Sequence, residues 1–516
     1  MALMRMGRKM TAGVASIPAP VGGWNAQSAI SAMKETDAVQ MINMFPNTTD
    51  VMLRQGRTDH VTGITGTIET LSAYNSATTS KLFGSTSSAI YNVSSAGAVG
   101  AAVVSAGITV GRWQYINFNV PGGAQWLYMV NGVDKPLAYN GTTWTAVDGA
   151  STPAITGVTT TNLVHVNIFK HRIWFVEKNS TRAWYLATDS IGGAATSFDV
   201  GALFSLGGYL MAMGTWSIDG GYGLDDVAVF ISSKGEIAIY RGTDPISATT
   251  FSLVGVFSIG SPIGRRCFIK YGGDLLLITQ DGLMPLSKAL ISERISLQSA
   301  ISFKIQYAIS SSVTQYGANF GWQVLQFPAQ NMIILNVPIS TTQFEQYVMN
   351  TLTGAWCRFT GWNASCWELF NDEIYFGTNG QVSKAWSGYS DAGSNITGDV
   401  IPGFSYFGSR ARLKRWTMAR PIISATGVPG VLMSMNVDFD TSAPTGVPTL
   451  ATPGGAIWDT SLWDTGTWGG QVTIQKAWQT IFGMGFAGSL HLLLTSKDSS
   501  VHWQATDFVY EHGAVI

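Results

Sequence analysis

The chain alternates between short apolar runs and polar turns over most of its length. The runs are rich in β-branched and aromatic residues, and Gly, Asn, Asp and Ser separate them. This pattern predicts short β-strands joined by tight turns. Helical periodicity is scarce and is strongest in residues 27–44 and 287–309. We therefore expect a mainly β protein with few helices.

One unit recurs along the first three quarters of the chain: an apolar strand, a polar turn and a second strand. Its copies begin at residues 82, 127, 173, 229, 275, 333 and 374, and an insertion loosens the sixth. Hairpins repeated at this spacing are typical of a β-propeller with one blade per repeat. A lone hairpin is only marginally stable in water, so the copies must pack on each other. We predict about seven blades; an irregular stack of β-sandwiches is the alternative.

The pattern changes after residue 393. In residues 431–440, Met433, Met435, Val437 and Phe439 alternate with polar residues, which predicts a half-buried antiparallel strand. A further hairpin pattern follows near the C-terminus. We predict an N-terminal arm or docking segment over residues 1–60, a β-propeller-like domain over 61–393, and a C-terminal antiparallel β-sandwich over 394–516.

The composition indicates a protein whose surface is largely covered by partners. Charged residues make up 12% of the 516 residues, against about 25% in typical globular proteins. A chain with so little charge and 11% aromatic residues is expected to be an assembly subunit. Its net charge of −1 argues against a strongly basic nucleic-acid-binding protein. We expect no signal peptide and no membrane anchor, since no apolar run is long enough to span a bilayer.

Candidate chemistry is sparse. The three cysteines, Cys267, Cys357 and Cys366, form no CxxC motif and are expected to be buried free thiols in a protein made in a reducing cytoplasm. No nucleophile elbow, P-loop or dinucleotide-binding glycine motif is present. His165 and His171 are the closest histidines, and the sequence around them offers no further metal ligands. We predict no enzyme activity, no catalytic residues, no metal site and no cofactor.

A basic stripe is the first candidate contact surface. In "SRARLKRW", Arg410, Arg412 and Lys414 fall on alternate positions and would share one face of a strand. Such a face could point towards DNA phosphates or towards a neighbouring subunit. The alternative is a solvated edge strand, on which Lys and Arg discourage aggregation.

Three tryptophans form the second candidate. Trp458, Trp463 and Trp468 lie five residues apart in "AIWDTSLWDTGTWGG". In a strand this spacing places successive rings on opposite faces, and in a helix it places them about 140° apart. A sugar-binding platform needs rings on one face, so we interpret the three as packing or inter-subunit anchors. The repeated Asp-Thr pairs that follow two of them are typical of turns.

Several long stretches resemble bacteriophage and prophage tail proteins. They are "GGWNAQSAISAMKETDAVQMINMFPNTTDVMLRQG", "GGYLMAMGTWSIDGG", "SPIGRRCFIKYGGDLLLITQDGLMPLSKALIS", "EQYVMNTLTGAWCRFTGW", "YFGSRARLKRW" and "ATDFVYEHGAVI". The resemblance covers nearly the whole chain. The segment "DAVQMINMFPNT", with the "LRQG" that follows it, is also similar to the opening of the hub or nozzle proteins of short-tailed phages, which are called packaged-DNA stabilisation proteins.

The resemblance implies a virion structural protein of a phage tail that is assembled in the host bacterial cytoplasm. It implies a hub or nozzle subunit that forms a ring with copies of itself, a hexamer by expectation. The ring would extend the DNA channel below the portal and its adaptor protein and retain the genome until ejection. Other implied partners are tail fibre, spike or needle proteins and the passing double-stranded DNA, which is contacted without sequence specificity. The alternative is a glycan-binding, receptor-binding propeller of the tail, and a glycan depolymerase is a further one.

Overall fold

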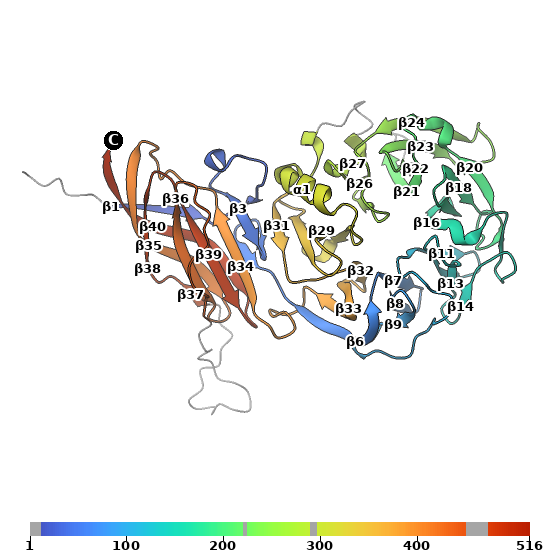
Figure 1. Ribbon diagram of the computed structural model, residues 1–516, viewed down its shortest axis with the longest axis horizontal. Coiled ribbons are helices and arrows are strands. Elements are labelled where there is room, and N and C mark those ends of the chain that lie inside the picture. Colours follow the sequence, from blue (N-terminus) through green and yellow to red (C-terminus); the bar gives the residue numbers. More distant parts are fainter. Residues whose placement is uncertain (1–11, 220–223, 289–296, 450–472, 516) are drawn as a thin grey trace, which may run out of the picture. The chain divides into compact units, whose positions relative to one another are not determined.

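A computed structural model of the chain describes residues 12–219, 224–288, 297–449 and 473–515 (Figure 1). The chain forms two compact units. Unit 1 contains residues 1–58, 347–360 and 386–516, and unit 2 contains residues 59–346 and 361–385. Each unit is therefore assembled from segments that are distant in the sequence.

Unit 2 is built from small, mainly antiparallel sheets arranged around a centre (Figure 1). The first sheet contains β7 (Thr70–Asn75), β8 (Ser80–Ser85) and β9 (Ile90–Asn92). The second contains β11 (Gln114–Val120), β12 (Ala124–Val130), β13 (Leu137–Tyr139) and β14 (Trp144–Ala146). The third contains β16 (Leu163–Phe169), β17 (Arg172–Glu177), β18 (Arg182–Tyr185) and β20 (Thr196–Asp199).

The remaining sheets of unit 2 continue the same plan. The fourth contains β21 (Leu210–Asp219), β22 (Leu224–Ser232), β23 (Glu236–Gly242) and β24 (Phe251–Ser258). The fifth contains β25 (Phe268–Tyr271), β26 (Asp274–Thr279) and β27 (Gly282–Pro285). The sixth begins with β28 (Gln323–Phe327) and β29 (Met332–Pro338), and in the next strand, β30 (Phe344–Asn350), the chain passes into unit 1. The seventh contains β32 (Cys366–Phe370), β33 (Glu373–Ala385), β6 (Arg57–Thr67) and β10 (Gly97–Ala98).

These sheets form a closed ring, which makes unit 2 a β-propeller with seven blades in the described residues. The first strands of successive blades contact one another from β7 through β11, β16 and β21, and from β25 through β28 and β32 back to β7. The fourth and fifth blades meet through β21 and β26. The predicted mainly β fold with about seven blades is confirmed.

The recurring hairpins of the sequence are the second and third strands of the blades. The first six repeats correspond to β8–β9, β12–β13, β17–β18, β22–β23, β26–β27 and β29–β30. The seventh repeat is not a hairpin: residues 373–385 form the single long strand β33. It pairs with β32 on one side and, on the other, with β6, which comes from the other end of the domain. The blade that closes the ring thus combines strands from both ends of the propeller sequence.

Hydrophobic clusters lie between adjacent blades and hold the ring together. One cluster joins Val130 of the second blade to Val166 and Phe175 of the third. Another joins Trp174 of the third blade to Phe230 of the fourth, and their rings meet edge to face with centroids 5.8 Å apart. Each of these clusters draws on two blades, so these blades bury apolar surface against one another, as expected for a repeat architecture.

Short elements complete unit 2. They are the strand pair β15 (Ile155–Thr156) and β19 (Gly193–Ala194), the helix α1 (Gln306–Tyr316), and the 3₁₀ turns η2 (Thr160–Asn162), η3 (Gly201–Leu203), η4 (Leu286–Lys288), η5 (Leu297–Ser299), η6 (Phe303–Ile305) and η7 (Pro328–Gln330). The helix falls at the end of the second segment of expected helical periodicity. The first segment, residues 27–44, forms mainly strands instead.

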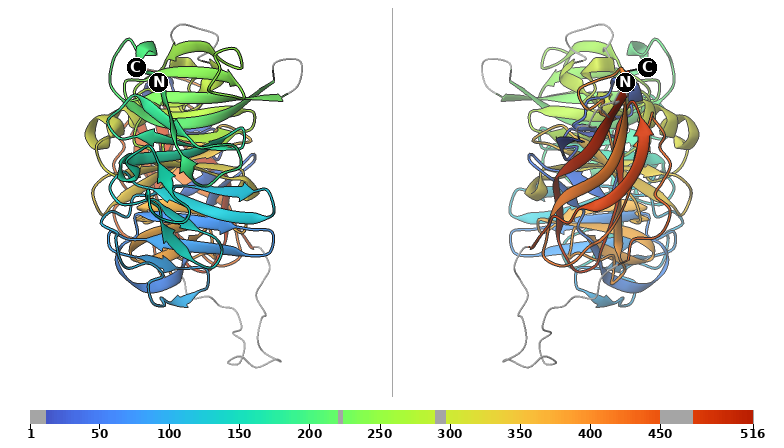
Figure 2. Two further views of the ribbon diagram at one scale, coloured as in Figure 1. Left: turned by 90° about the vertical axis from the view of Figure 1, so that its right-hand side faces the viewer. Right: turned by 90° about the vertical axis from the view of Figure 1, so that its left-hand side faces the viewer.

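Unit 1 is a sandwich of two sheets. Sheet A contains β1 (Ala12–Pro18), β4 (Met44–Pro46), β5 (Val51–Leu53), β35 (Arg412–Ala425), β37 (Thr473–Gln475), β38 (Gln479–Gly485) and β40 (Val501–Val515). Sheet B contains, within this unit, β2 (Gly23–Trp24), β3 (Asp37–Ile42), β31 (Trp356–Phe359), β34 (Ile396–Pro402), β36 (Gly430–Val437) and β39 (Gly488–Ser496). The 3₁₀ turn η1 (Ile30–Ala32) precedes β3. The orange-to-red strands of this unit lie side by side in the right-hand view of Figure 2.

The two sheets of unit 1 approach closely. A Cβ atom on Gly398 of β34 would lie 2.5 Å from the sulfur of Met44 in β4, and one on Gly488 of β39 would meet the ring of Trp416 in β35 at 2.8 Å. Glycine is thus required where the sheets touch. The predicted alternating strand is β36, and it ends at Val437 because Asp438 and Phe439 adopt left-handed φ values of 47° and 72°.

The predicted division into three consecutive parts differs from the observed units. The described residues of the expected N-terminal arm, 12–58, belong to the sandwich: β1 pairs with β40 and β3 pairs with β34. Because β-pairing partners can be any distance apart in sequence, the local pattern of residues 1–60 did not reveal them. The sandwich also includes residues 347–360, which lie inside the predicted propeller range.

Candidate functional site

A cluster of ionisable side chains lies in the centre of the propeller. A cavity of about 250 Å³ is lined by the inner strands β7, β11, β16, β28 and β32 and by the segment that leads into β25. We call this cavity the channel site. Its charged lining residues are Arg265, Arg266 and Glu368, and they are joined there by Tyr115 and His165.

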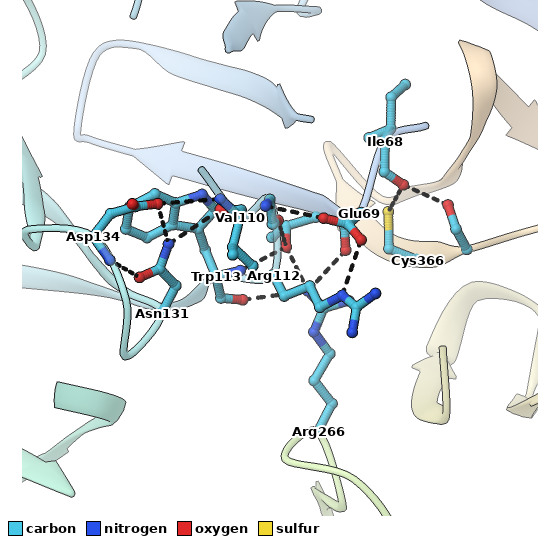
Figure 3. Close-up of polar contacts among 12 residues, drawn as sticks. Ile68, Glu69, Val110, Arg112, Trp113, Asn131, Asp134, Arg266 and Cys366 are labelled. Carbon is cyan, nitrogen blue, oxygen red and sulfur yellow. Dashed lines mark hydrogen bonds and ion pairs between the residues drawn. The ribbon is translucent and has the colours of Figure 1, made fainter. Parts of the chain in front are cut away.

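Arg266 ties several blades together across the channel (Figure 3). Its Nη2 donates to the carbonyl of Glu69 at 3.0 Å, to the hydroxyl of Thr70 at 2.5 Å and to the carbonyl of Trp113 at 3.3 Å. Its Nη1 donates to Oε1 of Gln323 at 3.3 Å. The guanidinium of the fifth blade thereby contacts the first, second and sixth blades. Burial lowers the pKa of Arg266, yet so basic a group keeps its charge at neutral pH.

The loop that leads into β11 is fixed from two sides, and Figure 3 shows both. Asp134 accepts hydrogen bonds from the backbone N–H groups of Thr109 and Val110, at 2.9 and 3.2 Å. On the other side, Glu69 accepts from the N–H of Gly111 and from Nε of Arg112, both at 2.9 Å. Burial raises the pKa of Asp134, but its hydrogen bonds outweigh that effect and the net pKa is lowered. The backbone beside Arg266 is therefore held in place by side chains of two blades.

Glu368 is the only carboxylate among the described residues that line the channel site. Burial raises its pKa to about 7, although the hydroxyl of Tyr115, which donates to its Oε2, and the charge of Arg266 act in the opposite direction. Burial, and then the charge of Glu368, raises the pKa of Tyr115. Near pH 7 this carboxyl group therefore exists in both protonation states.

His165 faces the same cavity in its neutral form. The residue is 5% exposed, and its Nδ1 atom has no hydrogen-bond partner among the described residues. Burial, assisted by the charge of Arg265, lowers its pKa to about 3. The described hydrogen bond of Arg265 is a 3.0 Å contact from Nη1 to the carbonyl of Met211. This side of the channel thus presents a cation and an imidazole whose donors and acceptors are not fully used.

The pH dependence of the free energy of unfolding should reflect both Glu368 and His165. Between about pH 4.5 and 7 the unfolded chain releases the Glu368 proton while the folded chain keeps it, so stability falls as pH rises. Between about pH 3 and 6.5 the unfolded chain protonates His165 while the folded chain does not, so stability rises with pH. In the range shared by the two groups, their contributions oppose each other.

Glu368→Gln and His165→Leu separate these contributions. We expect E368Q to leave a stability that rises with pH from 4.5 to 6.5, and H165L to leave one that falls, each by about 1–3 kcal/mol. Urea unfolding of both variants and the parent at pH 4.5, 5.5 and 6.5 measures this. Parallel profiles for all three proteins would contradict the assignment of these groups.

The predicted basic face does not form. Arg410 precedes β35 and lies over the ring of Tyr406 at 4.4 Å. Arg412 is exposed, whereas Lys414 is fully buried. The Lys414 ammonium donates to the carbonyls of Ser409, Arg412 and Phe486 at 2.5 to 2.9 Å, and burial lowers its pKa. The prediction was wrong for Lys414 because that side chain turns inward, to carbonyls at the start of its own strand and to that of Phe486 between β38 and β39.

The predicted tryptophan anchors Trp458, Trp463 and Trp468 lie outside the described residues. The predicted buried thiols are confirmed, since Cys267, Cys357 and Cys366 are buried and unpaired. Within the described ranges, no group of three or more His, Cys, Asp or Glu side chains could hold a metal ion. None of the described helices is long and apolar enough to cross a membrane.

A second, more open cavity of about 710 Å³ lies on the surface of unit 2. Lys170, His171 and Arg172 line it, and each faces a carboxylate: Asp225 at 3.1 Å, Asp189 at 3.4 Å and Asp244 at 3.7 Å. Its described lining contains no Trp, Tyr or Phe. Paired charges without an aromatic platform give it little specific binding chemistry.

Comparisons with known proteins give the chain no family. No protein-family model matches it, and no curated protein matches it. Among solved structures, it is similar to one described as "YCF48 bound to D1 peptide", at 10% identity and a TM-score of 0.37, over 67% of this chain and 97% of that one. It is also similar to BBS1N in complex with ARL6DN, at 16% identity and a TM-score of 0.28, over 46% of this chain and 74% of that one. These similarities are too low to bear on function.

The residues of the channel site were missed at the level of sequence. Tyr115, His165, Arg265, Arg266 and Glu368 come from four different blades, and none forms a motif with its sequence neighbours. One signal was available: each lies in, or just before, the strand that opens a blade. Polar residues at the first strand of successive repeats indicate the central channel of a propeller.

Proposed function

We propose that the protein is a structural subunit of a bacteriophage tail that assembles into a ring with copies of itself. The resemblance of its long stretches to phage tail proteins motivates this proposal. The observation that carries it is an apolar strand at the edge of sheet A. A ring subunit needs such a surface on every copy, because each interface joins one face of a subunit to a different face of its neighbour.

That surface is β38. Phe482 is 77% exposed and Met484 is 58% exposed, on the same side of the strand. Ile474 of β37 and Trp478 add exposed apolar area beside them. In the described part of the chain β38 pairs with β35 along one edge. Exposed apolar edge strands invite pairing with another chain, and soluble proteins usually protect them with charges. Covering by a second copy accounts for their presence.

The DNA conduit in this proposal lies between subunits and not through the propeller. The channel site measures about 250 Å³ and is crossed by the Arg266 side chain. A duplex whose major groove alone is about 12 Å wide does not fit there. The net charge of −1 suits a wall that lets DNA pass without gripping its phosphates.

The ring would lie below the portal and its adaptor in the virion tail, next to fibre, spike or needle proteins. A hexamer is the expected stoichiometry. The glycan-binding alternative stays a prediction: it requires an aromatic platform, and the described surface cavity has none.

Charge on the edge strand should abolish assembly. We expect Phe482→Asp with Met484→Asp to convert rings into monomers and to leave the fold intact, because both side chains point to solvent in the subunit. Each buried copy would lose about 1.5–3 kcal/mol per side chain and would gain like charges at every interface. Mass photometry and negative-stain electron microscopy measure the ring.

Leu206→Asp with Ile246→Asp is the matched control, since both side chains are exposed in unit 2. This control should assemble normally. Wild-type protein that stays monomeric at high concentration, alone and with the adaptor, would contradict the proposed function. Rings that persist in F482D/M484D would place the interface elsewhere.

A further inference from the structure

The channel site carries more positive charge than its fold uses. Its described lining has two guanidinium groups and one carboxyl group. Arg266 has four protein acceptors within 3.3 Å, so its donors are used in contacts that join the blades. Arg265 has one described hydrogen bond, at 3.0 Å to Met211, although a guanidinium carries five N–H donors. Four donors of Arg265 are therefore left for water or a ligand.

His165 supplies the second feature. It is 95% buried, and its Nδ1 atom lacks a described partner. A buried polar atom without a partner costs about 1–3 kcal/mol, so a ligand that offers this atom an oxygen would recover that cost. His165 and Arg265 both line the cavity, and the charge of Arg265 is close enough to act on the imidazole. A neutral imidazole can donate from Nδ1 to an oxygen atom.

We propose that the channel site binds one small oxyanion, a carboxylate or a phosphate, between the guanidinium of Arg265 and the Nδ1–H of His165. Arg265 supplies charge-assisted hydrogen bonds, and both carboxylates and phosphates can accept two of them from one guanidinium. The imidazole supplies a donor whose burial cost the ligand offsets. The volume of about 250 Å³ is below the usual range for drug-sized ligands, which restricts the occupant to a small molecule.

The remaining groups of the cavity fit an anion. Phe268 packs against the imidazole, with ring centroids 5.8 Å apart. Glu368 is held by the hydroxyl of Tyr115, and its high proton affinity reduces its repulsion of an anion below about pH 7. A bound cation would face two arginines, so the charge balance disfavours it.

Isothermal titration calorimetry of the full-length protein tests the proposal. The probes are sodium phosphate and sodium acetate, each titrated at pH 6 against sodium chloride at matched ionic strength. We expect saturable binding of one anion per chain with at least one of the two probes and none with chloride. The probe that binds identifies the source as phosphate or carboxylate. Saturation with neither would overturn the proposal.

Arg265→Gln should weaken that binding at least about tenfold, the loss expected for one charge-assisted contact. Arg182→Gln is the matched control: its side chain is 46% exposed on the third blade, and binding should be unchanged. His165→Leu removes the Nδ1 donor and also removes a buried polar atom without a partner, so it should weaken binding without reducing the thermal stability of the free protein. If R265Q does not fold, H165L decides the matter, and H165L that binds with parental affinity overturns the site.

A failure of the anion-binding proposal is distinguishable from a failure of the proposed tail function. Anion binding is measured on a single chain and requires no ring, and the edge-strand variant F482D/M484D should bind the anion with parental affinity.

Discussion

Asp391→Ala should destabilise unit 1 by about 3–5 kcal/mol, because it leaves a buried arginine without its counter-ion. Arg54 is 2% exposed. Its Nη1 and Nη2 donate to the two oxygens of Asp391 at 2.9 and 2.6 Å. Its other donors reach Oδ1 of Asn43, the carbonyl of Gln55 and the carbonyl of Thr360, at 2.9 to 3.0 Å. All five N–H donors of the guanidinium are therefore used.

A double variant tests whether the uncompensated charge of Arg54 causes this loss of stability. Adding Arg54→Met to D391A removes the uncompensated charge and should recover part of the lost stability, as replacing a buried ion pair by apolar groups often does. Glu511→Ala is the control in the same unit, since the Arg415–Glu511 pair is 3.9 Å apart and exposed, and its loss should cost less than about 1 kcal/mol. Urea unfolding measures the changes, and hydrogen exchange of peptides covering β5 locates them. A double variant less stable than D391A would show that the charge is not the cause.

The Arg54 network also explains why the segment "DAVQMINMFPNTTDVMLRQG" was wrongly assigned to an N-terminal arm. Asn43, Arg54 and Gly56 are specified by tertiary contacts: Asn43 has a left-handed φ of 55°, and a Cβ atom on Gly56 would lie 1.9 Å from the carbonyl oxygen of Ser390. Local polarity suggested an arm. Their distant partners, Thr360, Ser390 and Asp391, are more than 300 positions away in the chain, and one sequence without its relatives gives no access to such pairings.

The propeller was predictable because its information is local and repeated. Each hairpin joins strands a few residues apart, and its apolar and polar positions recur at every blade. The closing blade was the exception: β33 pairs with β6, so the hairpin expected from residue 374 is one strand completed from the other end. The sandwich was predicted for residues 394–516 from the alternation in β36, and its strands from residues 12–58 were missed for the same reason of distance.

The channel site shows why the candidate functional site could not be predicted from the sequence. His165 was visible in the sequence as an isolated strand histidine, and its surroundings gave no reason to expect a missing hydrogen-bond partner. The pKa of Glu368 depends on burial beside Tyr115 and Arg266, which three separate blades supply. The candidate basic face of Arg410, Arg412 and Lys414, by contrast, does not form in the structure, since Lys414 turns inward to three carbonyl oxygens. Residue type and spacing did not determine which charges face solvent.

Arg266→Ala should destabilise the propeller by about 2–4 kcal/mol. The substitution removes the donor shared by the Glu69 and Trp113 carbonyls, the Thr70 hydroxyl and the Gln323 amide oxygen, and lost hydrogen bonds in the interior are costly. The hydroxyl and the amide oxygen still accept from the backbone N–H groups of Trp113 and Trp367, so the two carbonyls carry most of the loss. It also removes the positive charge beside Glu368, so the pKa of that carboxyl should rise above about 7. Arg266→Lys keeps the charge but not the planar fork, and should recover only part of the loss.

Arg112→Ala is the matched control for R266A. Both guanidinium groups lie over the ring of Phe320, at 4.3 Å for Arg112 and 5.5 Å for Arg266, and both contact Glu69, but the Arg112 side chain is 52% exposed. Its loss should cost less than about 1 kcal/mol. Thermal unfolding ranks the variants, and hydrogen exchange should rise in β7 and β11 for R266A alone. If R112A costs as much as R266A, the loss in R266A cannot be assigned to the contacts that Arg266 makes between blades.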